Sequence, residues 1–175
     1  YSGELGHNFM YRNNMFSLEN DISAFYMEID DWIMWVPYGL NWKPENKKKV
    51  GASGIELNTK LKWEFPNSSM ELGGMYAYNR SILLEGISED DPAVGNQLAY
   101  TPEHRAVLFA NFMYKKYRLS ITNSFTGERN GLDKNEKLDG FAVTNIDLGR
   151  NISLGKHLFS IEGKVLNFLD IEYQN

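Results

Sequence analysis

The 175-residue chain contains no cysteine, which excludes disulfides, thiolate metal sites and cysteine nucleophiles. It has no excess of basic residues either. The net charge is -5 and the pI is near 5.2, which argues against a nucleic-acid partner. No apolar run approaches the roughly 20 residues of a transmembrane helix, and the mean hydropathy is -0.45. A helical membrane protein is therefore excluded. A membrane β-barrel is not, because its lipid-facing residues alternate with polar ones.

The chain also has little that resembles catalytic chemistry. Its histidines, His7, His104 and His157, are scattered and show no metal-ligand spacing. No Ser-His-Asp order and no paired-carboxylate motif stands out, although an enzyme would need such a constellation on one face. We therefore expect neither a catalytic residue nor a metal site nor a cofactor, and we do not expect an enzyme.

What the chain does have is alternation of apolar and polar residues, most clearly over residues 101–129 (TPEHRAVLFANFMYKKYRLSITNSFTGER). Two such runs flank a short polar turn at Lys115 and Lys116. Their apolar positions share one parity: Ala106, Leu108, Ala110, Phe112 and Tyr114, then Tyr117, Leu119, Ile121 and Phe125. A period of two predicts strands, because successive side chains point to opposite faces of a sheet. One face is apolar and the other carries hydroxyl and charged groups.

The same pattern predicts further strands at residues 2–11, 15–34, 50–65, 69–84, 141–152 and 158–168. Short turns near residues 13, 67, 115 and 155 alternate strictly with long loops near residues 39, 91 and 133. An up-and-down antiparallel sheet would gather the short turns at one end and the long loops at the other, as outer-membrane barrels do. We therefore predict an all-β fold, namely an antiparallel up-and-down transmembrane β-barrel segment of about eight strands taken from a larger barrel.

Aromatic residues, which form 14% of the chain, gather at the predicted strand ends. Tyr11, Trp63 and Tyr114 are among those beside the short turns, and Trp32 and Tyr78 are among those nearer the long loops. Two belts of amphipathic rings fit the two interfaces of a membrane. Aromatic packing in the core of a soluble protein is the alternative explanation.

Four stretches carry a resemblance to a known family: residues 50–57 (VGASGIEL), 100–106 (YTPEHRA), 125–129 (FTGER) and 165–173 (VLNFLDIEY). In this order, they resemble motifs in the C-terminal barrel segment of TonB-dependent receptors, the active transporters of Gram-negative outer membranes. The stretch at residues 32–50 is most similar to receptors of Bacteroidota, including a cobalamin-receptor-like branch.

The resemblance implies TonB-dependent transport of a scarce ligand across the outer membrane, with a ligand of the iron–siderophore, haem or cobalamin class. The implied partners are membrane lipid, the small-molecule ligand and the TonB complex, which acts through a plug domain. Residues 1–175 would be a C-terminal part of the receptor barrel, without the plug and without the final strand.

The stretch at residues 35–49 breaks the alternation and is predicted to be an extracellular loop. Within it, Trp35, Tyr38 and Trp42 are the candidate ligand-binding residues, because exposed aromatics on a loop usually bind something or anchor at an interface. Their partner would be the ligand or a surface lipoprotein. Anchoring at the membrane interface is the alternative, and Trp35 fits it better than Trp42 does.

Two other interpretations of the predicted sheet stay open. The chain could be a complete small barrel of about eight strands with a structural or adhesion role, a size that side chains can fill. It could also be a soluble ligand-binding β-barrel. Pairing between the first and last strands would show that the barrel is complete and small.

Overall fold

The structure is a computed structural model that describes residues 1–86, 91–131 and 136–174. Among these residues no helix is long and apolar enough to cross a membrane. The strands are β1 (Ser2–Arg12), β2 (Phe16–Tyr38), β3 (Asn41–Phe65), β4 (Ser68–Glu85), β5 (His104–Tyr114), β6 (Tyr117–Thr126), β7 (Arg129–Asn130), β8 (Lys137–Leu138), β9 (Phe141–Leu154) and β10 (His157–Val165).

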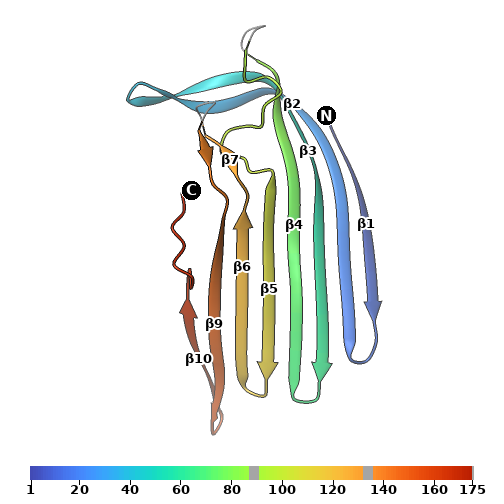
Figure 1. Cartoon of the computed structure of the whole chain (residues 1–175). Coiled ribbons are helices and arrows are strands. Elements are labelled where there is room, and N and C mark those ends of the chain that lie inside the picture. The colour runs from blue at the N-terminus through green and yellow to red at the C-terminus, as the bar shows by residue number, and fades with distance from the viewer. Residues whose placement is uncertain (87–90, 132–135, 175) are drawn as a thin grey trace.

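Eight strands form one antiparallel sheet in the order β1-β2-β3-β4-β5-β6-β9-β10 (Figure 1). Strands of this sheet that follow one another in the chain pair with each other. The small β7–β8 hairpin, which comes between β6 and β9 in the chain, forms a separate two-stranded sheet. The all-β, up-and-down architecture predicted from the alternation is therefore confirmed. The short turns lie together at one end of the sheet and the long connections at the other (Figure 1).

The register places the apolar positions of neighbouring strands directly opposite one another. Phe112 pairs with Leu119, which pairs with Leu148, and Ile121 pairs with Ile146. We call this the outer face. The opposite side, the inner face, carries Asn111, Ser120 and Asp147 in one row across β5, β6 and β9. Because side chains alternate along every strand, one register fixes both faces at once.

The sheet is open. β1 and β10 lie at opposite edges, and no ladder joins them within the described residues (Figure 1). The alternative of a closed eight-stranded barrel is therefore wrong for this arrangement. The predicted outer strands at residues 2–11 and 158–168 are indeed the two edge strands. The last one ends at Val165, earlier than expected, because the chain turns at Asn167, whose φ is 48°.

The predicted loop at residues 35–49 is the main error of the sequence analysis. The structure continues β2 to Tyr38 and begins β3 at Asn41, so this stretch is a long two-stranded hairpin closed by Gly39 and Leu40. Gly39 has a φ of 61°, as the first central position of a type II′ turn requires. The alternation fails here because both faces of a two-stranded ribbon are exposed, so burial does not constrain either face.

Inner-face glycines allow bulky rings to lie flat across the sheet. A Cβ atom on Gly54 would lie 2.8 Å from the ring of Phe25, and one on Gly73 would lie 2.4 Å from the ring of Phe109. Phe25 and Phe109 are the direct cross-strand partners of these glycines. The aromatic ring thus covers the backbone of its neighbour, which stabilises a glycine in a strand.

The loop after β4 folds back onto that strand, which is longer than β5. Gln97 is the central residue, because its side-chain oxygen accepts from the Ser81 N–H (2.9 Å) and its amide nitrogen donates to the carbonyls of Asn79 and Thr101 (both 3.1 Å). β4 extends beyond the end of β5, and there the Gln97 side chain forms the hydrogen bonds that a neighbouring strand would otherwise make with the β4 backbone. Leu83, with 2% exposure, is buried beneath the loop.

The predicted polar loop near residue 133 is partly structured, since β7 and β8 pair within it. Its centre, residues 132–135, lies outside the described residues.

Candidate functional site

The candidate residues Trp35, Tyr38 and Trp42 all lie on the distal part of the β2–β3 hairpin, which we call the arm (residues 31–48). In Figure 1 the arm turns away from the strand direction and runs across the long-loop end of the sheet. The turn occurs where Asp31 adopts a φ of 56°, a left-handed conformation that Asp tolerates better than most residues. The exposed fractions of the three aromatic side chains are 60%, 69% and 60%.

The register divides the three aromatics between the two faces of the arm. Trp35 pairs with Pro44, and Pro37 pairs with Trp42, so the two tryptophans are diagonal neighbours on one face. Tyr38 lies on the other face, where the Lys43 ammonium lies 5.4 Å from the centre of its ring. The arm therefore presents an indole pair on one side and a cation-stacked phenol on the other.

Both prolines of the arm are placed where they remove no ladder hydrogen bond. In a hairpin with a two-residue turn, the closing pair Tyr38–Asn41 is hydrogen-bonded and the next pair is not. Pro37 and Pro44 occupy non-hydrogen-bonded pairs, so the N–H that each lacks would have pointed away from the partner strand. Proline on a free edge also prevents a further strand from adding to it.

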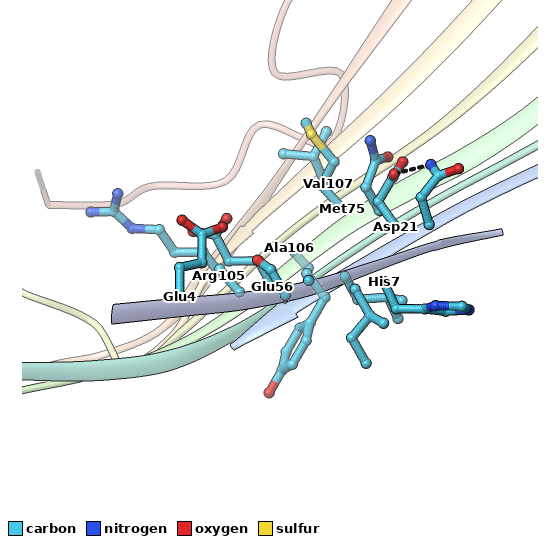
Figure 2. A pocket seen from close by; sticks show the side chains of 16 residues that line it. Glu4, His7, Asp21, Glu56, Met75, Arg105, Ala106 and Val107 are labelled. Atoms are coloured by element: carbon cyan, nitrogen blue, oxygen red, sulfur yellow. Dashed lines mark hydrogen bonds between the residues drawn. The ribbon is translucent and has the colours of Figure 1, made fainter. Parts of the chain in front are cut away.

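A second candidate region is a hollow of about 660 Å³ on the inner face, lined by β1 to β5. Its inner-face side chains include Glu4, Glu56, Met75, Arg105 and Val107. Figure 2 shows Asp21, Met75 and Val107 on one side of the strands, whereas His7 projects from the other side of β1. The hollow combines carboxylates with one guanidinium and apolar groups, which suits a polar organic molecule or a packed protein segment.

Polar pairs continue along the inner face toward the short turns. Lys60 and Glu19 lie 3.6 Å apart, the Asn8 amide donates to Asp21, and Arg118 pairs with Glu162. The first two pairs join neighbouring strands, whereas the third reaches across β9 to join β6 and β10. The described residues contain no group of three or more His, Asp or Glu side chains placed to hold a metal ion.

On the outer face, charged groups begin only beyond the apolar part of each strand. At the long-loop end, Glu28 accepts from Lys49 (2.6 Å) and from the hydroxyl of Tyr1 (2.7 Å), and Tyr26 also donates to it. The hydrogen bond from Lys49 is the main reason that the pKa of Glu28 falls to about 2. At the short-turn end, Arg150 stacks on Tyr117 at 5.0 Å.

The outer face of β2 is free of charged side chains from Phe16 to Tyr26. That stretch has the length of a tilted transmembrane strand, about 9–11 residues. Aromatic side chains lie at both of its ends, and at the long-loop end the hydroxyl of Tyr76 meets Nδ1 of His104 at 2.7 Å. An apolar band flanked by amphipathic rings is the outward surface of an outer-membrane barrel.

The family model described as "TonB dependent receptor-like, beta-barrel" matches residues 1–168. The chain belongs to this family. No curated protein matches the chain significantly. The TonB-dependent receptor family consists of outer-membrane transporters rather than enzymes, so this chain is part of a TonB-dependent transport barrel in the outer membrane of a Gram-negative bacterium. In barrels of this kind the apolar outer face meets lipid, and the long loops lie on the extracellular side.

Sequence reasoning singled out the aromatic residues that lie on the arm, but not the hollow of this TonB-dependent receptor barrel. The parity of the alternation was a signal that could have assigned Glu4, Glu56 and Arg105 to the inner face. Their proximity depends on the register between β1 and β5, strands that lie about a hundred residues apart in the chain. The FTGER motif contained a further sequence signal, a charged residue within a family motif. The structure buries this residue, Arg129, at 6% exposure.

Proposed function

We propose that the chain is a C-terminal part of the wall of a receptor that imports a scarce ligand of the iron–siderophore, haem or cobalamin class. The observation that carries this proposal is the match of residues 1–168 to the TonB-dependent receptor family. The open, up-and-down sheet agrees with it. Unpaired strand edges cannot persist in lipid. β1 and β10 therefore pair with further strands of the same receptor.

The TonB complex drives passage of the ligand by displacing a plug domain, and this wall surrounds the passage. The ionic inner face supports that role, because pairs such as Glu19–Lys60 and Arg118–Glu162 link different strands and present a wet surface to a folded plug. Large transporter barrels hold such a plugged lumen.

The arm is the part of this wall that contacts the extracellular ligand or a surface lipoprotein partner. Its aromatics support this role, because Trp and Tyr supply large rigid contact areas at binding interfaces. The division of the arm into two faces assigns them different contacts: Trp35 and Trp42 contact one surface, and Tyr38 contacts the other. The position of the arm across the loop end keeps it clear of the outer apolar band (Figure 1).

Uptake measurements on the full receptor test this role. Trp42→Ala and Tyr38→Ala, separately and together, are expected to reduce ligand uptake while surface expression stays normal. Each anchor that is lost from an interface centre costs on the order of 2 kcal/mol, or about thirtyfold in affinity.

Tyr114→Ala is the matched control. Tyr114 is 57% exposed, comparable with Tyr38, but it lies beside the short turn at the opposite end of the sheet. Its replacement should leave uptake unchanged. Normal uptake by the Trp42 and Tyr38 variants would remove the arm from the binding surface, without affecting the assignment of the wall.

A further inference from the structure

A small pocket of about 330 Å³ lies at the extracellular end of β5, β6 and β9, apart from the arm. It is lined by Tyr100, Pro102, Arg105, Thr126, Arg129 and Phe141. Among the described residues, the lining contains two guanidinium groups, two hydroxyl groups and no carboxylate. Arg105, Thr126 and Phe141 stand in one inner-face row across the three strands, so the pocket opens on the side that an incoming solute reaches.

Arg129 is the decisive residue. Its side chain is buried, with 6% exposure, and its Nη1 has no hydrogen-bond partner among the residues that the structure describes. Its Nη2 donates to the carbonyl of Gln174, and the guanidinium lies 5.4 Å from the ring centre of Phe141. A buried cation with unused donors is costly unless an anion completes it.

Glu128, the acidic residue that precedes Arg129 in the sequence, does not provide that anion. Glu128 is paired with Lys137. The pairing raises the pKa of Lys137 through the hydrogen bond from its ammonium, so both charges of this pair are already compensated.

The second arginine of the pocket also has donors to offer. Arg105 is exposed, and its side chain forms no ion pair or hydrogen bond with any part of the chain that the structure describes. It lines both this pocket and the larger hollow that contains Glu4 and Glu56. An anion in the pocket would therefore be held between a fixed, buried arginine and a movable one at the rim.

The remaining walls favour a fixed site over a diffuse basic surface. Phe141 is stacked on Tyr173, with the ring centres 4.4 Å apart and the planes 17° apart. The backbone N–H of Tyr100 donates to the Asn130 carbonyl at 2.7 Å, and the residue holds a φ of 58°. The aromatic stack and this strained loop residue hold the sides of the pocket around the Arg129 donors.

We propose that Arg129 and Arg105 form a binding site for an oxyanion, a carboxylate or a phosphate, carried by a solute that reaches the inner side of the barrel. A guanidinium presents paired N–H donors that match the two oxygens of such groups. The proposal deepens the transport function proposed above, because it names a chemical group on the transported ligand and rests on that function for the ligand's route.

Anion binding to the purified full receptor in lipopolysaccharide-free detergent tests the site directly, without measuring uptake. The probes are inorganic phosphate and citrate, titrated by calorimetry. Saturable binding of at least one probe is expected for the wild type, and Arg105→Gln should weaken it at least tenfold. Arg129→Gln should abolish it, and Arg129→Lys should restore only part of it because the planar fork is lost.

Arg80→Gln is the matched control, since it removes the same charge from the loop end of β4 without touching the pocket. Arg129→Gln also removes the bond to the Gln174 carbonyl and could disturb the fold, so Arg105→Gln is the deciding variant. Absence of saturable binding in the wild type, or equal binding by Arg105→Gln and wild type, overturns the site.

A second arm of the experiment identifies the source of the anion. The titration is repeated with the receptor in nanodiscs that contain lipopolysaccharide, whose phosphates have the same chemistry. Unchanged binding supports a solute, because the pocket lies on the inner face. Competitive loss of binding would overturn the solute assignment and give the site to a lipid headgroup. Neither result depends on uptake, so failure of this proposal and failure of the transport proposal are distinguishable.

Discussion

The wall and the arm are built from the same two strands, β2 and β3, yet they follow different rules. Between Ser17 and Met27, β2 has a neighbour on each side and one lipid-facing surface, and its side chains alternate accordingly. Beyond Asp31 the two strands pair only with each other, and the alternation is lost. The comparison shows that backbone pairing extends a strand, whereas the environment of its faces decides the sequence pattern.

The two regions also use glycine and proline differently. In the wall, Gly54 and Gly73 make room for rings that lie across the sheet. In the arm, Gly39 supplies a positive φ for the turn, and Pro37 and Pro44 occupy free edges. A substitution should therefore lower the free energy of unfolding clearly in the wall and hardly at all in the arm.

The largest effect should follow from a charge on the lipid-facing side of the wall. Ile121→Arg, near the middle of β6, should cost about 2–4 kcal/mol, the penalty for arginine at the bilayer midplane. Thr122→Arg, at the same depth but on the inner face, should cost much less, and Leu40→Arg at the tip of the arm should cost almost nothing. Denaturant unfolding in lipid vesicles measures all three, and equal penalties at Ile121 and Thr122 would contradict the assignment of the faces.

A methyl group at Gly54 should have the next largest effect. A Cβ atom there would lie 2.2 Å from the Tyr78 carbonyl oxygen, so the backbone must shift. We expect Gly54→Ala to destabilise the wall by about 1–3 kcal/mol, as overpacking does. Gly163→Ala in the edge strand β10 is the control, because nothing lies within 4 Å of its added Cβ. The unfolding midpoints of the two variants in the same vesicles decide the point.

Acid should weaken the wall more gently, at the Glu28–Lys49 pair where β2 and β3 lead into the arm. The pKa of Glu28 is lowered from 4.5 to about 2, chiefly by the Lys49 ammonium. A lowered folded-state pKa stabilises the fold above the unfolded-state pKa, and this stabilisation is lost as the pH falls from about 4.5 through about 2. Glu28→Gln should flatten the stability profile in that window. A profile that stays as steep as that of the wild type would mean that other carboxylates dominate.

Removal of the arm should have the smallest effect on the wall. Deleting residues 32–47 would leave Asp31 and Lys48 as a two-residue turn, closed by the existing Asp30–Lys49 pair. Asp31 already holds the positive φ that such a turn uses. We expect wall stability to change by no more than about 0.5 kcal/mol, as for other surface changes, while ligand uptake falls. A large loss of stability would show that the arm is part of the folded wall.

Alternation made most of the wall predictable. Ile121 and Ser120 could be assigned to opposite faces from the sequence, because a strand that borders lipid on one side must alternate. The arm could not be predicted as a strand, since a ribbon wet on both faces need not alternate, and prolines at 37 and 44 argue against a strand unless the register is known. Trp35, Tyr38 and Trp42 were found as exposed aromatics, but their separation onto two faces required the pairing.

The sequence by itself determined the period-two pattern, the order of short and long connections and the family motifs, because each of these is a local property of the chain. Only the tertiary structure decided that β1 and β10 stay apart, that Gln97 hydrogen-bonds the exposed backbone of β4 beyond β5, and that Arg105 and Arg129 line one pocket. These features join residues from different strands. Cross-strand register and loop path, which no local pattern encodes, determine which of them meet.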